Sequence, residues 1–273
     1  MFKDILVPID SANSTAVRID AAVKLSSQCN AHATGLYVVE PVNLPGYAEV
    51  AIGADLLERT RLEYMQQAED AGKAFRERMD SEGIANEFRI SEGLTGTRIV
   101  DQAHYSDLVV MAQRDPNDYN DVSGSLADQI ILGCGRPVMV VPYIGAPDQI
   151  GNKVLLAWNG TREAVRALHD ALPILQNAKE VVVMTINAEN SADHIPGSDI
   201  SLHLARHGVN ATVNSTVSKD IDIGDTLLSR ASDLGVDCMV MGAYGHSRFR
   251  ELVMGGATRH ILRHMTVPVL MSH

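Results

Sequence analysis

A series of glycines near the end of the chain has a spacing that suits contact with a phosphate group. Gly242 and Gly245 are followed, after nine intervening residues, by Gly255 and the run 256–258. An apolar run precedes the series and a helix-like pattern follows it. Glycine lets the backbone approach an anion closely, and the first N–H groups of a helix point at that anion. The series therefore predicts a phosphate-binding loop, with a purely structural turn as the alternative.

The elements that must position this loop are short apolar runs that alternate with helical patterns along the whole chain. This alternation is typical of a parallel sheet with right-handed crossover helices. The predicted strands are 4–9, 33–39, 86–90, 107–112, 138–141, 153–158, 180–186, 211–216, 237–242 and 268–271. Ligands of such sheets bind beyond the carboxyl ends of the strands. Asp10, Asn159 and the loop that begins at Gly242 all follow predicted strands, so they can converge on one crevice.

The two halves of the chain resemble each other. The aligned runs are 5–10 with 154–159, 107–112 with 237–242, and 136–141 with 267–271. The same features recur in the same order, which a duplication explains better than chance. A linker rich in Pro and Gly, 142–152, separates the halves. We therefore predict two domains, 1–148 and 149–273, each a small doubly wound α/β domain with a parallel five-stranded sheet.

The composition is that of a soluble globular protein. The chain has 273 residues, of which 45% are hydrophobic and 21% charged. The net charge of −11 argues against non-specific binding to nucleic acid or to an anionic membrane. No stretch approaches the roughly 18 apolar residues of a membrane span, and the N-terminus lacks the apolar stretch of a signal peptide. We therefore expect a cytoplasmic protein.

The cysteines do not form a metal or disulfide motif. The chain has three, Cys29, Cys134 and Cys238, and no C-x-x-C pair. We expect buried free thiols in a reducing compartment.

Three segments resemble the universal stress protein family in its tandem two-domain form. They are the opening 3–10, the glycine series 242–258 and the closing 267–271. The resemblance covers nearly the whole chain, once per half. It implies two flavodoxin-like domains, of the adenine nucleotide alpha hydrolase-like kind, that pack as a pseudo-dimer through their last strands, 138–141 and 267–271. An uncovered sheet edge invites aggregation, so this pairing also has a physical motive.

The resemblance places an adenine nucleotide in the second half. The family's motif is Gly, two residues, Gly, nine residues, Gly, then Ser or Thr, and members that match it look like ATP binders. The residues implied to contact the nucleotide are Ala157, Trp158, Asn159, Thr185, Met241, Gly242, Gly245, His246, Gly255, Gly256, Ala257 and Thr258. Gly256 replaces the Ser or Thr of the motif. Asn159 replaces an Asp, so it still accepts a hydrogen bond but carries no charge.

The first half departs from the motif in the opposite way. Asp10 is present and Gly124-Ser125 matches the end of the motif, but Ala112 and Asp115 replace its first two glycines. Asp115 would put a carboxylate where phosphates lie. We therefore predict that the first half does not bind ATP and has a structural or regulatory role.

Two histidine pairs have a spacing that can chelate a metal. His203 and His207, like His260 and His264, share a helix face at i, i+4. No carboxylate or cysteine stands at an obvious ligand spacing, so we predict solvated or capping histidines and no metal site. The run 246–250 contains two arginines, for which phosphate contact and a solvated loop are equal alternatives.

The leading functional prediction is a regulator of the stress response that binds ATP or another adenine nucleotide. Magnesium is the expected companion of ATP; the protein partners are unknown, and a homodimer is a further expectation. The alternative is a tandem scaffold that has lost nucleotide binding and works through partners. The least favoured alternative is an enzyme with slow ATP hydrolysis, because no residue is an evident general base. No catalytic residue is assigned.

Overall fold

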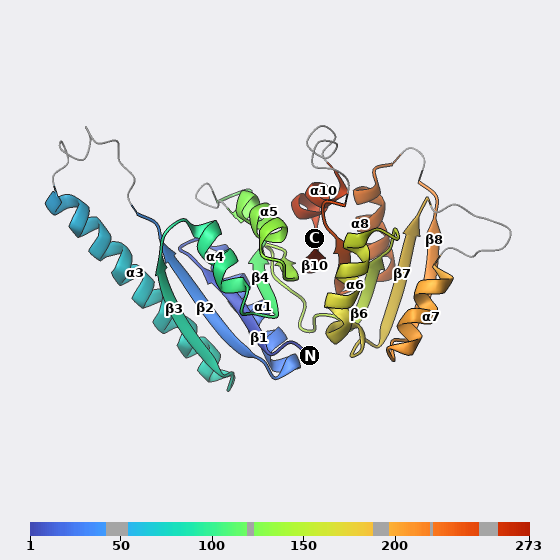
Figure 1. Ribbon diagram of the computed structural model, residues 1–273, viewed down its shortest axis with the longest axis horizontal. Helices are drawn as coiled ribbons and strands as arrows, with labels where there is room; N and C mark the ends of the chain where they lie inside the picture. Colours follow the sequence, from blue (N-terminus) through green and yellow to red (C-terminus); the bar gives the residue numbers. More distant parts are fainter. Residues whose placement is uncertain (42–53, 119–122, 188–196, 219–220, 246–255) are drawn as a thin grey trace.

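The first half of the computed structural model is an alternating α/β unit (Figure 1). The structure describes residues 1–41, 54–118, 123–187, 197–218, 221–245 and 256–273. The elements of the first half are β1 (Asp4–Ile9), α1 (Ser14–Cys29), β2 (His32–Val39), α3 (Ala54–Ser81), β3 (Asn86–Glu92), α4 (Thr95–Ala103), β4 (Leu108–Ala112), α5 (Ser123–Gly133) and β5 (Val138–Val141). All five predicted strands of this half are confirmed to within two residues.

The second half repeats this order. Its elements are β6 (Lys153–Ala157), α6 (Arg162–Leu175), β7 (Glu180–Ile186), α7 (Ser198–Arg206), β8 (Ala211–Thr216), α8 (Ile223–Leu234), β9 (Cys238–Gly242), α10 (Ala257–His264) and β10 (Val269–Ser272). Near the centre of each half, β4 is buried along its whole length, and β1, β6 and β9 are buried except at one or both ends. Parallel strands that are covered on both faces read as continuous apolar runs, which is why the sequence located them.

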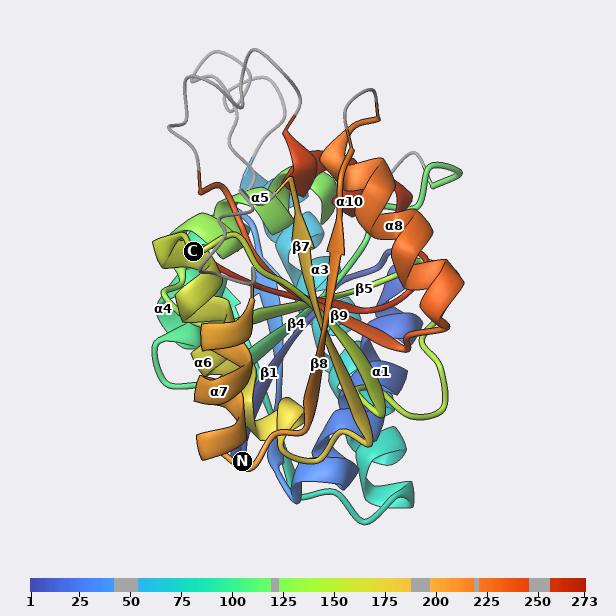
Figure 2. The same ribbon diagram turned by 90° about the vertical axis from the view of Figure 1, so that its right-hand side faces the viewer.

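One continuous sheet of ten strands joins the halves. Its order is β3-β2-β1-β4-β5-β10-β9-β6-β7-β8, and each half is parallel within itself. The halves meet where β5 and β10 pair antiparallel, with Val269 opposite Val140 and Met271 opposite Val138. The predicted pairing of the two last strands is confirmed. Figure 2 shows the strands rotating about one another along this twisted sheet.

Helices cover both faces of the sheet and enclose two apolar clusters. One cluster includes side chains of α1, α3, α6 and α7. The other includes side chains of α4, α5, α8 and α10. The side chains of both clusters are mainly aliphatic. The expectation of buried free thiols is confirmed, because Cys29, Cys134 and Cys238 are all free and buried.

In each half, an aspartate carboxylate accepts hydrogen bonds from the backbone amides at the start of the first strand. The Asp107 carboxylate accepts hydrogen bonds from the amides of Lys3 and Asp4 at the start of β1. The Asp237 carboxylate accepts from the amides of Gly151, Asn152 and Lys153 at the start of β6. The two aspartates are aligned in the sequence repeat, so the repeat extends to this contact. No helix in the described parts of the chain combines the length and apolar character that a bilayer crossing requires.

Candidate functional site

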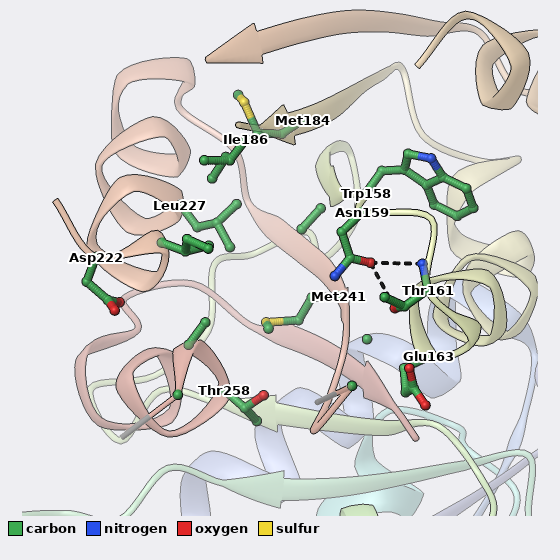
Figure 3. Close-up of a pocket in the computed structure, with 16 residues that line it drawn as sticks. Trp158, Asn159, Thr161, Glu163, Met184, Ile186, Asp222, Leu227, Met241 and Thr258 are labelled. Atoms are coloured by element: carbon green, nitrogen blue, oxygen red, sulfur yellow. Dashed lines mark hydrogen bonds between the residues drawn. The ribbon is translucent and has the colours of Figure 1, made fainter. Parts of the chain in front are cut away.

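A pocket of about 540 Å³ opens in the second half, beyond the carboxyl ends of β6, β7 and β9 (Figure 3). The first turns of α6, α8 and α10 complete its wall. Its lining is Ala157, Trp158, Asn159, Thr161, Glu163, Met184, Ile186, Asp222, Ile223, Leu227, Met241, Gly242, Gly245, Gly256, Ala257 and Thr258. Five segments of the second half, 157–163, 184–186, 222–227, 241–245 and 256–258, therefore meet at the position that doubly wound sheets use for ligands.

The glycine at the end of β9 allows close packing against α6. A Cβ atom at Gly242 would lie 2.6 Å from the backbone nitrogen of Ala164 and 2.6 Å from the carbonyl carbon of Glu163. Backbone atoms cannot move aside, so only glycine fits here. A Cβ atom at Gly245 would instead lie 3.0 Å from Glu163 Oε2 and 3.5 Å from Thr161 Oγ1. A side chain at Gly245 would therefore meet the ends of two side chains that line the pocket.

The first turn of α10 also faces the pocket. Gly256 is its N-cap residue, and Gly256, Ala257 and Thr258 all belong to the lining. The amides of a first helical turn lack partners within the helix and carry the positive end of its dipole. The Thr258 hydroxyl accepts a hydrogen bond from the Tyr244 amide at 3.2 Å, so it fixes the glycine loop against α10.

One wall of the pocket is apolar. Met184, Ile186 and Leu227 lie on one side of the cavity, and Met241 lies between them and the polar wall (Figure 3). Thr185 is not part of the lining, because alternate side chains of a strand point to opposite faces. Its methyl group instead faces the other side of the sheet, near Gly197. The sequence analysis thus selected Thr185, whereas its neighbours Met184 and Ile186 form the wall.

The polar wall is built on the start of α6. The side-chain oxygen of Asn159 accepts hydrogen bonds from the amide of Thr161 at 3.2 Å and from its hydroxyl at 2.8 Å. Thr161 is in turn the N-cap residue of α6, and its hydroxyl accepts from the Ala164 amide. These two hydrogen bonds hold Asn159 at the pocket. Both use its side-chain oxygen, and neither uses its amide nitrogen. Trp158 is partly buried against the core.

Two carboxylates line the pocket that the sequence analysis did not select. Glu163 is 7% exposed and pairs with Arg162, whose Nη2 lies 3.1 Å from its Oε1. Asp222 is the N-cap residue of α8 and accepts from the Gly224 amide at 2.7 Å. Both stand at helix starts, where acidic residues are favoured, so capping patterns are the signal that would have found them. The described part of the lining contains no lysine or arginine.

One of the two histidine pairs has carboxylates beside it. Asp222 and Asp225 of α8 and His260 of α10 each offer a ligand atom within 4.8 Å of the others. His260 Nε2 lies 2.8 Å from Asp225 Oδ1. The sequence analysis found no carboxylate at ligand spacing because these residues come from different helices. Imidazole with carboxylates suits zinc or manganese better than magnesium, which prefers oxygen ligands alone.

The other pair gains a third histidine. The ring of His169 on α6 lies 5.3 Å from that of His203 and 6.1 Å from that of His207. Burial lowers the pKa of His203, and the neighbouring His207, His169 and Arg206 lower it further. His203 lies on α7, which packs against β8 at one end of the sheet, whereas His169 lies on α6, which packs against β9 and β10.

The corresponding corner of the first half contains an ion pair. Arg18 of α1 is fully buried, and its Nη2 contacts the Asp10 carboxylate. The hydroxyl of Thr15 and the amide of Ala12 also donate to that carboxylate. Burial by itself raises the pKa of Asp10, but Arg18 and these donors outweigh it and lower the pKa below its usual value. Asp10 is therefore already occupied as an acceptor.

In the first half, the residues that replace the first two motif glycines also have structural roles. Ala112 ends β4 and is fully buried. Asp115 forms a turn, in which its carboxylate accepts from the Asn117 amide at 2.8 Å. In the second half, His246 and Gly255 lie outside the described residues, as does the arginine-containing run 247–250.

The comparisons with known proteins agree with the fold. The model of the universal stress protein family matches residues 1–142 and again 152–273. Universal stress protein Slr1230 of Synechocystis is 27% identical over 151 residues, which are 54% of this chain and half of that relative. A universal stress protein structure from Archaeoglobus fulgidus covers 98% of this chain and 95% of its own, with 16% identity and a TM-score of 0.78.

A further solved structure has the same extent. A putative universal stress protein from Pseudomonas aeruginosa covers 99% of this chain and 93% of its own, with 14% identity and a TM-score of 0.59. At such low identities the two structures establish the shared fold alone. The family model, in contrast, accounts for both halves of the sequence. The chain therefore belongs to the universal stress protein family, whose domain it contains twice in tandem.

Proposed function

We propose that the pocket of the second half binds an adenine nucleotide, with ATP as the leading ligand, and that the protein acts as a nucleotide-responsive regulator of the stress response. The observation that carries the proposal is the meeting of the glycine loop after β9 with the first turn of α10 at one pocket. Backbone amides there suit phosphate groups. The apolar wall of Met184, Ile186 and Leu227 suits a flat base.

The proposal assigns binding to the second half and not to the first. In the second half Asn159 carries no charge and keeps its amide nitrogen for a ligand. In the first half Asp10 is engaged by the buried Arg18, and Ala112 fills the place of the first motif glycine. The first half then contributes structure or regulation.

The alternative function, a scaffold without a nucleotide, also has a supporting observation. Glu163 and Asp222 place two carboxylates in the lining, and like charges repel phosphate. This repulsion and the amides of α10 act in opposite directions, so a binding measurement decides between the two functions. A divalent cation at Asp222 and its neighbours would reduce the repulsion.

The experiment is a titration of the purified chain with ATP, ADP, AMP and cAMP by calorimetry, with and without Mg²⁺. Gly245→Val is the test variant, because its side chain would meet Glu163 and Thr161 within the pocket but no backbone atom among its nearest contacts. We expect it to weaken binding at least tenfold, which is about 1.4 kcal/mol. Gly242→Val is unsuitable, because it would clash with the backbone of α6.

Gly133→Ala, at the end of α5, is the control, since a Cβ atom there makes only ordinary contacts with Val100 of α4. It should bind like the wild type, and both variants should retain the wild-type circular dichroism. Absence of binding in the wild type would favour the scaffold. If Gly245→Val leaves the affinity unchanged, the ligand binds outside this pocket.

A further inference from the structure

The glycine loop of the second half is anchored to the first half of the chain. The hydroxyl of Tyr244, which lies between Gly242 and Gly245, donates to Asp128 Oδ1 of α5 at 2.5 Å. Arg259, in the first turn of α10, places its Nε 3.6 Å from Asp128 Oδ2. One carboxylate of the first half therefore contacts both segments of the second half that form the anion-binding side of the pocket.

Tyr244 adopts a backbone conformation that needs outside support. Its φ is +56°, in the left-handed region that residues other than glycine, asparagine and aspartate seldom adopt. Glycine at this position would avoid the steric cost but would have no side chain to reach α5. The tyrosine is 8% exposed, its amide donates to Thr258, and its ring meets the edge of the His273 ring at 6.5 Å. The contact with Asp128 is the one among these that comes from the other half.

We infer that Asp128 is a positioning residue, through which the first half sets the geometry of the glycine loop and of the start of α10. Asp128 is not among the residues that line the pocket, and it acts through Tyr244 and Arg259. Its effect on nucleotide affinity rests on the proposed function, whereas its effect on the loop does not. The first half, with its altered motif, then has a physical role in the site of the second.

The test compares four single variants of the full chain and one double variant, Asp128→Ala with Tyr244→Phe. Asp128→Ala removes both contacts, and Tyr244→Phe removes the hydroxyl but keeps the ring. Asp128→Asn keeps an acceptor for the tyrosine hydroxyl and loses the charge that faces Arg259. Asp101→Ala is the matched control, because Asp101 is also a helical aspartate of the first half, paired with Arg98 within α4.

The first readout is hydrogen exchange of the nucleotide-free protein, followed in peptides that contain 242–245 and 257–262. We expect at least tenfold faster exchange there in Asp128→Ala and Tyr244→Phe, wild-type rates in β7, and an intermediate effect in Asp128→Asn. The double variant should exchange no faster than Asp128→Ala alone, because Asp128→Ala already removes the contact that Tyr244→Phe removes. Faster exchange throughout the second half would indicate a general loss of stability and would overturn the inference. Unchanged exchange rates in the loop peptides would overturn it as well.

The second readout is the affinity for ATP, which we expect to fall about tenfold in Asp128→Ala and to recover in Asp128→Asn. Faster loop exchange with wild-type affinity would show that Asp128 does not position the binding site, and would overturn that part of the inference. A wild type that binds no nucleotide would reject the proposed function, while the exchange rates would still decide whether the first half holds the loop.

Discussion

At the scale of single residues, Asp10 and Arg18 distinguish the first half from the second. The sequence analysis found at Asp10 the aspartate that the family resemblance implies for a nucleotide site, yet its carboxylate serves the fully buried Arg18. A buried guanidinium without a partner is costly, because charge is poorly stabilised away from water. Asn159, at the aligned position of the second half, carries no charge with which to neutralise an arginine. The same corner of the fold thus holds an internal ion pair in one half and an open pocket in the other.

We predict that Asp10→Asn lowers the free energy of unfolding by about 2 kcal/mol at pH 7, below the range for fully buried pairs because Asp10 is partly exposed. The folded-state pKa of Asp10 is lowered, so its contribution is present above the unfolded pKa of about 3.9 and is lost as the pH falls below that value. Urea unfolding at pH 7 and pH 3 measures both values. The difference between wild type and variant should shrink at pH 3.

The variant Arg18→Met combined with Asp10→Asn serves as the control, since it removes the buried charge together with its partner. It should regain stability relative to Asp10→Asn. A double variant that is less stable than Asp10→Asn would contradict the electrostatic explanation.

At the scale of elements, Asp107 and Asp237 set where the first strand of each half begins. Each follows the helix that precedes a central strand and reaches across to the amides of the neighbouring strand. Backbone amides at a strand start have no ladder partner, so a carboxylate supplies the missing acceptors. The duplication has preserved this contact, whereas it has not preserved the loop glycines.

We predict that Asp237→Ala destabilises the protein by about 2 kcal/mol, because three amides lose their acceptor, and that Asp107→Ala costs about 1 kcal/mol, because only two do. Urea unfolding of the two variants gives the comparison. Asp148→Ala, in the linker, is the control and should stay within about 0.5 kcal/mol of the wild type. Equal losses for Asp107→Ala and Asp237→Ala would contradict an effect that scales with the number of amides.

At the scale of the whole molecule, the antiparallel pairing of β5 with β10 makes one sheet from two domains. Val138, Val140, Val269 and Met271 are all fully buried at this junction. Without it, each half would expose a flat apolar strand edge. The contact of Asp128 with Tyr244 and Arg259 also exists only because the two halves are joined in this register.

We predict that Val269→Asp lowers the free energy of unfolding by about 3 kcal/mol or more, since it buries an unpaired charge at the junction. Thermal unfolding is the measurement. Val213→Asp on the edge strand β8 is the control, because Val213 is 37% exposed and the new charge can reach water. A melting temperature of Val269→Asp equal to that of the control would mean that β10 is not a buried junction in solution.

The sequence by itself determined the secondary structure and the architecture. Buried parallel strands have continuous apolar runs, and runs such as 107–112 and 237–242 recur in both halves, so the strand positions, the duplication and the pairing of the last strands followed from local pattern and resemblance. The glycine series also located the loop after β9, although the need for glycine at Gly242 comes from its close packing against the backbone of α6.

Only the tertiary structure decided which side chains share the pocket. Thr185 and Ile186 are adjacent in sequence, yet strand alternation sends them to opposite faces, and only the folded structure shows that Ile186 is the one that lines the pocket. Glu163 comes from α6, whereas Asp222 and Leu227 come from the start of α8, and the relative rotation of these two helices is set by packing. The link from Asp128 to Tyr244 spans the two halves of the chain. Contacts of this kind depend on how separate elements dock, and no local sequence pattern encodes that docking, because it results from the packing of the whole core.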